Sequence, residues 1–271
     1  MMPSFQDELG DEEIQKIIEY LRGFCTEQGW PRGDLNLPRA FITEKAFPEN
    51  EAVLTTTIVP SHERSVSNEF LYEHRLGRRG QYEINVPLNL QLGSDRRWTV
   101  GLGDFSAAYK HALYDSFSKG SILSTGGEVK FPTGRRLGSG GTVFEAFGTF
   151  SQALPSDGFL HAHVGFEAPF DLDRVPKEAF WRVALGRSFM EHRWGRAWSP
   201  MVEVLGAREL VEGGEPEWDL LPQMQVSLSN RQHILVNAGV RIPVNERSDR
   251  GKSILLYLLW DWFDGTIADG W

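Results

Sequence analysis

Two histidines and a glutamate form the densest group of chemistry-bearing side chains in this sequence. His161 and His163 occupy alternate positions of one predicted strand, with Glu167 further along it on the same face. Residues two apart on a strand point to one side, and two imidazoles with a carboxylate can bind a transition metal. The same pattern arises where polar rings line a polar interior. We expect no metal, and these three residues are the candidate ligands if one binds.

No enzymatic centre emerges from the remaining motifs. The single cysteine, Cys25, excludes an internal disulfide framework and a cysteine-rich metal site. No G-x-S-x-G motif occurs, and the dispersed histidines single out no catalytic triad. Arginine pairs could bind lipopolysaccharide phosphates, although such pairs are more often solvated loop charge. These pairs are Arg78-Arg79, Arg96-Arg97 and Arg135-Arg136. We expect a protein that is not an enzyme.

Charge and hydropathy exclude two further classes. The chain has 28 Lys and Arg against 37 Asp and Glu, a formal net charge of −9, so it offers no basic field for nucleic acid. Its longest apolar run, 254–260, is far shorter than the roughly 18 residues of a membrane-spanning helix. The N-terminus lacks the pattern of a secretory signal. We expect either a cytosolic protein or a chain whose true start lies further upstream.

The elements that must position these residues are long strands. In 81–92 the even positions from Tyr82 to Leu92 are all apolar, and the odd positions are polar or proline. Similar alternation fills 218–228 and 233–242. A tilted strand that crosses a membrane needs about 9–11 residues, and these windows are long enough.

Prolines near predicted strand ends recur in steps of 45, 37 and 74 residues, which indicates a hairpin unit of 37 residues. From residue 51 onward this unit predicts an all-β, antiparallel transmembrane β-barrel of about 12 strands, with a range of 10–12, preceded by a short N-terminal helix. The expected strands are 52–60, 65–76, 80–92, 97–111, 117–131, 141–153, 158–170, 178–191, 197–209, 216–229, 231–243 and 252–263.

Two features favour a barrel whose apolar face meets lipid. Aromatic residues such as Trp98, Trp218 and Trp260 gather near predicted strand ends, as at a membrane interface. Charged and amide side chains fall in mid-strand on the opposite face, which a wet lumen accommodates. The expected lumen-lining residues are Glu83, Asn85, Glu128, His161, His163, Glu167, Arg182, Glu203, Gln223, Gln225 and Arg241. The alternative is a soluble β-barrel or sandwich that binds a lipid-like ligand.

The N-terminal part is predicted to contain one helix, over 11–25. Ile14, Ile17 and Leu21 belong to an apolar stripe at helical spacing, and acidic residues precede it. Residues 30–50 contain three prolines and little periodicity, and we expect an extended linker there. The predicted organisation is 1–29, a helical piece; 30–50, the linker; and 51–271, the barrel.

The string from Met2-Pro3-Ser4-Phe5 through the predicted helix resembles the C-terminal end of class I c-type cytochromes. The resemblance implies that Met2 is a haem axial ligand, if a haem domain is supplied upstream. The C-x-x-C-H attachment motif is absent from this chain, so we expect no cofactor here and haem c only in a longer parent protein.

The motifs in 34–48 and the strand ending at 131–134 resemble outer-membrane barrels described as transporter-like in phenol meta-cleavage pathways. The resemblance implies transport without naming a substrate. We therefore expect a pore for small solutes in the outer membrane of a Gram-negative bacterium, in contact with lipid and lipopolysaccharide. The alternative is a barrel that anchors a periplasmic cytochrome for electron transfer.

Overall fold

The structure is a computed structural model that describes residues 9–22, 31, 33–60, 64–93, 95–170, 175–191, 196–229, 233–245 and 250–262. The chain divides into two compact units, Met1–Trp30 and Pro31–Trp271.

The first unit contains one helix, α1 (Asp11–Arg22). At its start the Glu13 carboxylate accepts a hydrogen bond from the backbone N–H of Gly10, at 3.1 Å. Lys16 and Glu12, one turn apart, form an exposed ion pair of 2.9 Å. The predicted helix is confirmed as far as Arg22, and its predicted continuation lies outside the described residues. None of the described helices has the length and apolar content needed to span a membrane.

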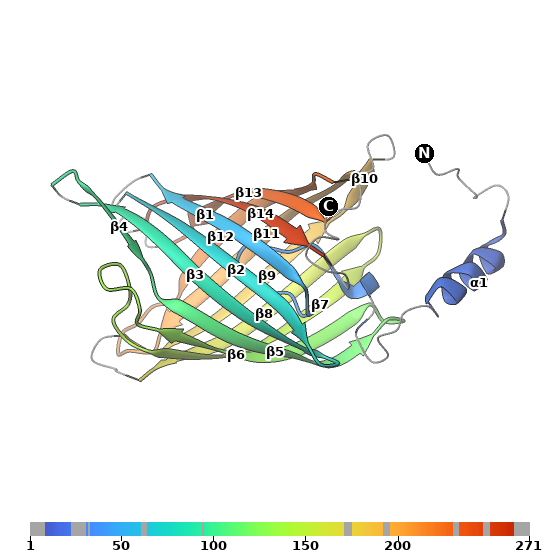
Figure 1. Cartoon of the computed structure of the whole chain (residues 1–271), viewed down its shortest axis with the longest axis horizontal. Helices are drawn as coiled ribbons and strands as arrows, with labels where there is room; N and C mark the ends of the chain where they lie inside the picture. Colours follow the sequence, from blue (N-terminus) through green and yellow to red (C-terminus); the bar gives the residue numbers. More distant parts are fainter. Residues whose placement is uncertain are drawn as a thin grey trace. The chain divides into compact units, whose positions relative to one another are not determined.

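The second unit is a closed antiparallel β-barrel (Figure 1). Neighbouring strands pair antiparallel around the wall, with β5 following β3 and β11 following β9, and β1 pairs with β14, so the sheet closes on itself. The strands are β1 (Glu51–Val59), β2 (Ser65–Leu76), β3 (Gly80–Leu92), β4 (Trp98–Leu102), β5 (Phe105–Ser116), β6 (Ser121–Phe131), β7 (Val143–Leu154), β8 (Gly158–Pro169), β9 (Glu178–Arg187), β10 (Phe189–Glu191), β11 (Arg196–Glu209), β12 (Glu217–Ser227), β13 (Ile234–Pro243) and β14 (Ser253–Asp261).

These segments make the twelve barrel strands that the sequence predicts. β4 and β5 lie end to end along β3, interrupted at Gly103 and Asp104. β9 and β10 lie end to end along β11, interrupted at Ser188. The predicted strand 97–111 therefore extends further, to Ser116, and contains one break.

The outer face of the barrel is apolar. In β14 the side chains of Ile254 and Leu258 are exposed, whereas those of Leu255 and Tyr257, between them, are buried inside the barrel. Exposed large apolar side chains recur in the same alternation around the wall. A band of this kind needs lipid as its solvent. The soluble alternative requires the reverse arrangement and does not fit.

The two ends of the barrel differ in the length of their connections. The turns 77–79, 117–120 and 155–157 are short and lie at the end where β1 begins and β14 finishes. Gly77 and Gly120 supply the positive φ angles that such turns need. The connections at the other end are longer, including 132–142 and 210–216.

The barrel interior is occupied by residues 33–50, which we call the luminal segment. It starts with a 3-10 turn, η1 (Gly33–Leu35), and continues without regular structure to β1 (Figure 1). The sequence predicts an extended linker at 30–50, yet Ala46 and Phe47 are at most 1% exposed. Phe41 packs edge-on against Tyr257 of the wall, with ring centroids 5.0 Å apart. The segment thus shares a core with the inside of the barrel.

Candidate functional site in the barrel lumen

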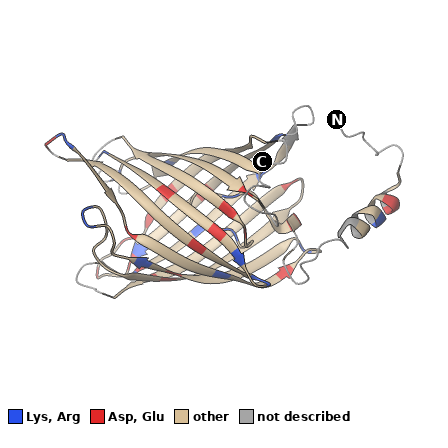
Figure 2. Ribbon diagram, viewed as in Figure 1, with Lys and Arg blue, Asp and Glu red and all other residues tan. Residues whose placement is uncertain are grey.

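A row of carboxylates crosses the inner wall. Glu51, Glu73 and Glu83 lie in direct register on β1, β2 and β3. The row resumes on β6 and β7, where Glu128 is opposite Glu145, and Figure 2 shows acidic positions on these neighbouring strands. Like charges directly opposite each other destabilise a sheet. The row therefore requires cations inside the lumen.

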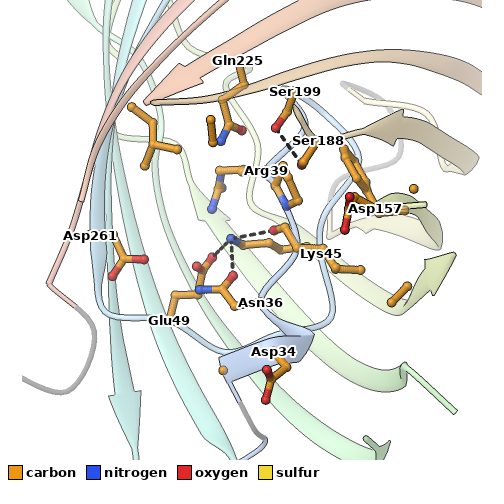
Figure 3. Close-up of a pocket in the computed structure, with 18 of the residues that line it drawn as sticks. Asp34, Asn36, Arg39, Lys45, Glu49, Asp157, Ser188, Ser199, Gln225 and Asp261 are labelled. Atoms are coloured by element: carbon orange, nitrogen blue, oxygen red, sulfur yellow. Dashed lines mark hydrogen bonds and ion pairs between the residues drawn. The ribbon is translucent and has the colours of Figure 1, made fainter. Parts of the chain in front are cut away.

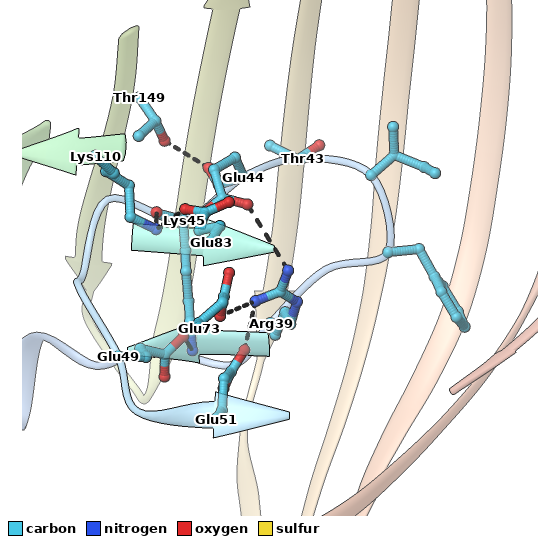
Figure 4. A network of polar contacts seen from close by, with 12 residues as sticks. Arg39, Thr43, Glu44, Lys45, Glu49, Glu51, Glu73, Glu83, Lys110 and Thr149 are labelled. Atoms are coloured by element: carbon cyan, nitrogen blue, oxygen red, sulfur yellow. Dashed lines mark hydrogen bonds and ion pairs between the residues drawn. The ribbon is translucent and has the colours of Figure 1, made fainter. Parts of the chain in front are cut away.

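The luminal segment and β5 supply those cations for the first half of the row (Figure 4). Arg39 pairs with Glu51 and lies 2.9 Å from a carboxylate oxygen of Glu73. The fully buried ammonium of Lys110 pairs with Glu44 of the segment and lies 3.7 Å from Glu83. The segment is consequently part of the charge balance of the wall.

Glu203 of β11 holds the segment from the opposite wall. Its carboxylate accepts hydrogen bonds from the backbone N–H groups of Phe41 at 2.9 Å and Thr43 at 2.6 Å. It also accepts hydrogen bonds from the Thr43 hydroxyl at 2.6 Å and from the side-chain amide of Gln223. Glu203 is fully buried, so these charge-assisted bonds replace its water.

The two histidines of β8 also contact the luminal segment. His161 Nε2 lies 2.9 Å from the carbonyl oxygen of Pro38, and its Nδ1 lies 2.7 Å from the Ser151 hydroxyl. The backbone N–H of Glu44 donates to His163 Nδ1 at 3.3 Å. Glu167 is absent from both arrangements. Of the described residues, the acidic groups that converge closely enough to hold a metal include none of these three candidates.

The second half of the row has fewer cations near it. Glu145 is in register with Glu128 and Glu167, and Glu167 with Glu178. Arg182 lies beside this group, stacks over the Phe180 ring at 3.9 Å and donates to the carbonyl of Ile42 at 3.4 Å. This part of the lumen is acidic.

A cavity lies on each side of the luminal segment. The larger one, about 650 Å³, is at the short-turn end, and Asp34, Lys45, Asp157 and Asp261 are among its lining residues (Figure 3). The other, about 220 Å³, is lined by carboxylates together with Arg182 and His163. The segment separates two spaces that both admit water.

The structure divides the predicted lumen residues into three groups. Those in contact with the luminal segment or with the core beside it are His161, His163, Glu203, Gln223 and Gln225. Those lining the 220 Å³ cavity include Glu83, Asn85, Glu128 and Arg182. The third group, Arg241 and Glu167, forms no hydrogen bond with the described luminal segment and does not line that cavity. Arg241 pairs with Asp219 at 2.5 Å, and Glu167 is opposite Glu145. Met2 lies outside the described residues.

The charged residues that hold the segment are not among the candidates expected from the sequence. Arg39, Glu44 and Lys45 fall in the expected linker, and Lys110 is not among the expected lumen residues. A usable signal exists, because Phe41, Ile42 and Phe47 are too apolar for an exposed linker. Lys110 itself lies in mid-strand, between Tyr109 and His111.

One carboxylate outside the regular strands fixes a loop. Asp104, between β4 and β5, accepts hydrogen bonds from the backbone N–H of Gly134 at 2.9 Å and from the N–H and hydroxyl of Ser139 at 2.6 Å. Burial raises the pKa of this carboxyl, but the hydrogen bonds outweigh it, and the pKa is lowered from its usual value. Asp104 thereby anchors the 132–142 connection to the wall.

No family model and no curated protein matches this sequence. Among solved structures, an outer-membrane channel from Pseudomonas putida F1 is similar with a TM-score of 0.57 at 11% identity, covering 82% of this chain and 99% of that one. The NanC porin gives a TM-score of 0.54 at 8% identity, and the KdgM porin 0.52 at 7%, each covering 78% of this chain and 98% of the porin. At such identities the likeness shows the fold alone. That fold is the 12-stranded barrel of outer-membrane porins and channels.

Proposed function

We propose that this chain is a channel for small solutes in the outer membrane of a Gram-negative bacterium, and that its luminal segment closes it. The observation that carries the proposal is the division of a polar lumen into two water-accessible cavities by a segment bonded to the surrounding wall. The outward apolar band supports the membrane setting.

Barrel size supports a path that one chain segment can close. About eight strands are filled by their own side chains, and 16–18 leave an aqueous channel. A twelve-stranded barrel lies between these limits. Removing the luminal segment would leave a passage lined by the carboxylate row, whereas the segment in place lies between the two cavities.

The difference between the two ends supports an orientation. Outer-membrane barrels have short periplasmic turns and longer extracellular loops. The start of β1, the end of β14 and the luminal segment's larger cavity are then on the periplasmic side. Arg96 and Arg135, at the long-loop end, are on the side where lipopolysaccharide would be met, whereas Arg79 pairs with Asp115 at the other end.

The resemblance of 34–48 and 131–134 to transporter-like barrels of phenol meta-cleavage pathways supports transport and names no substrate. The alternative role, a membrane anchor for a cytochrome, depends on Met2, outside the described residues, and stays a prediction.

Single-channel recording in planar bilayers tests the proposal. The full chain and a variant lacking residues 33–48 are refolded and inserted under identical conditions. We expect rare, small current steps from the full chain and larger, long-lived steps from the deletion variant. Glu209→Gln, an exposed change on the same wall, is the matched control and should behave as the full chain.

Two results would contradict the proposal. One is equal conductance of the full chain and the deletion variant. The other is a deletion variant that inserts with native β-structure by circular dichroism and carries no current.

A further inference from the structure

Three buried glutamates converge where the luminal segment joins the wall. Glu49 is the next-to-last residue of the segment, Glu51 begins β1 and Glu73 lies in β2, in register with Glu51. One carboxylate oxygen of each lies within 4.8 Å of an oxygen of the other two. All three residues are at most 2% exposed. Such a concentration of negative charge in a dry site needs compensation.

Each of these carboxylates has one paired oxygen and one free oxygen. Glu49 Oε2 lies 2.5 Å from the ammonium of Lys45, and Arg39 pairs with one oxygen of Glu51 and one of Glu73 (Figure 4). The other oxygens, Oε1 of Glu49, Oε2 of Glu51 and Oε1 of Glu73, are buried and accept no hydrogen bond from any described residue. Buried polar atoms without partners are uncommon in folded proteins and point to a missing ligand.

The charges of the network do not balance. Three cations, Arg39, Lys45 and Lys110, face five carboxylates, which are Glu44, Glu49, Glu51, Glu73 and Glu83. Asp261, in register with Glu51, and Arg75, two residues beyond Glu73, carry opposite charges and leave the balance unchanged. The formal excess is two negative charges, which one divalent cation would neutralise.

We propose that Glu49, Glu51 and Glu73 bind a divalent cation of the calcium type. Carboxylate oxygens are the ligands that hard cations prefer, and Ca²⁺ accepts six to eight oxygens in flexible geometry. Glu49 and Glu51 line the 650 Å³ cavity, so the cation and its remaining water ligands have a route from the short-turn end. Bound there, the cation joins the luminal segment to β1 and β2.

Two bound protons are the competing explanation, because protonated glutamates would also remove the excess charge. The two differ in what they respond to. A cation site responds to Ca²⁺ and to chelators at constant pH, whereas a protonated cluster responds to pH alone. Binding to the site does not depend on solute passage, so failure of the channel proposal would leave it intact.

Isothermal titration of the refolded full chain in detergent, stripped with a chelator and titrated with CaCl₂ at pH 7.5, tests the proposal. We expect one Ca²⁺ per chain. Glu49→Gln and Glu73→Gln should each weaken the affinity roughly tenfold or more. Glu178→Gln, a wall glutamate outside the network, is the matched control and should bind as the native chain does.

Thermal unfolding of the same samples keeps the test decisive if a variant folds poorly. CaCl₂ should raise the Tm of the native chain and of Glu178→Gln, and leave that of Glu49→Gln unchanged. Absence of Ca²⁺ binding to the native chain, with a Tm that changes with pH but not with CaCl₂, would overturn the proposal in favour of protons. Equal Ca²⁺ affinity in Glu49→Gln and the native chain would overturn the assignment of the cation to this site.

Discussion

Glu203 and Thr43, 160 residues apart in the sequence, are joined by two hydrogen bonds of 2.6 Å, from the backbone N–H and the hydroxyl of Thr43 to one carboxylate oxygen. The charge of Glu203 makes each bond stronger than a neutral one. This contact fixes the middle of the luminal segment against β11, and the segment has no regular backbone structure of its own there.

Glu203→Gln should loosen the segment. An amide accepts through a single oxygen without charge, so the variant loses about 2–3 kcal/mol of unfolding free energy and opens more often in planar bilayers. Urea unfolding in detergent and the open probability measure the two effects. Glu209→Gln should change neither quantity. An unchanged open probability in Glu203→Gln would mean that this contact does not hold the closed state.

Phe47→Ala should destabilise the barrel by removing packing between the luminal segment and the inner wall. Phe47 is 1% exposed, and the guanidinium of Arg75 lies 5.7 Å from its ring centroid. Removing a buried aromatic ring costs about 3–5 kcal/mol, measurable by urea unfolding. Phe170→Ala, at a 78% exposed position beyond β8, should cost far less. Equal costs at the two positions would show that the luminal segment adds no packing energy.

Leu258→Arg should hinder insertion. Leu258 faces outward near the middle of β14 and is 48% exposed on the surface assigned to lipid. Arginine at the bilayer midplane costs about 2–4 kcal/mol, falling to about 0–1 near the interface. Ile254→Arg, on the same face at the strand end, should therefore cost less. Folding titrations into lipid vesicles measure the cost of both variants. An equal cost would contradict a lipid-facing outer surface on which Leu258 lies deeper in the bilayer than Ile254.

Asp104 should make the 132–142 connection sensitive to acid. Its folded pKa is lowered, so the stability it adds is complete above its unfolded pKa, about 3.9, and is lost as pH falls through the lower folded value. The difference in unfolding free energy between the native chain and Asp104→Asn should be constant from pH 5 to pH 7 and shrink below about pH 4. If the difference in unfolding free energy grew on acidification, the folded pKa of Asp104 would be raised and not lowered.

The strands of the barrel wall can be predicted from the sequence, whereas the luminal segment and its contacts with the wall cannot. Period-two alternation, as between Gln81 and Leu92, depends on local geometry and reports which face is apolar. It cannot report that Arg39 meets Glu51 and Glu73, because that contact is set by which strands surround the segment. The buried histidines and Glu203 are predictable as inward-facing residues, but their partners lie in a segment without periodicity. The breaks at Asp104 and Ser188 are likewise tertiary features.

A reversible crosslink tests most directly the claim that the luminal segment closes the lumen. Ala46 N–H donates to the Ser151 hydroxyl at 2.9 Å, which brings the two residues within reach of a disulfide. The protein carries Ala46→Cys and Ser151→Cys, with Cys25→Ser to remove the other thiol and Glu203→Gln to loosen the segment. Single-channel current is recorded before and after reduction of the same inserted molecules. We expect low conductance while the disulfide is closed and a rise in open probability on reduction. An unchanged current would show that the luminal segment does not close the lumen.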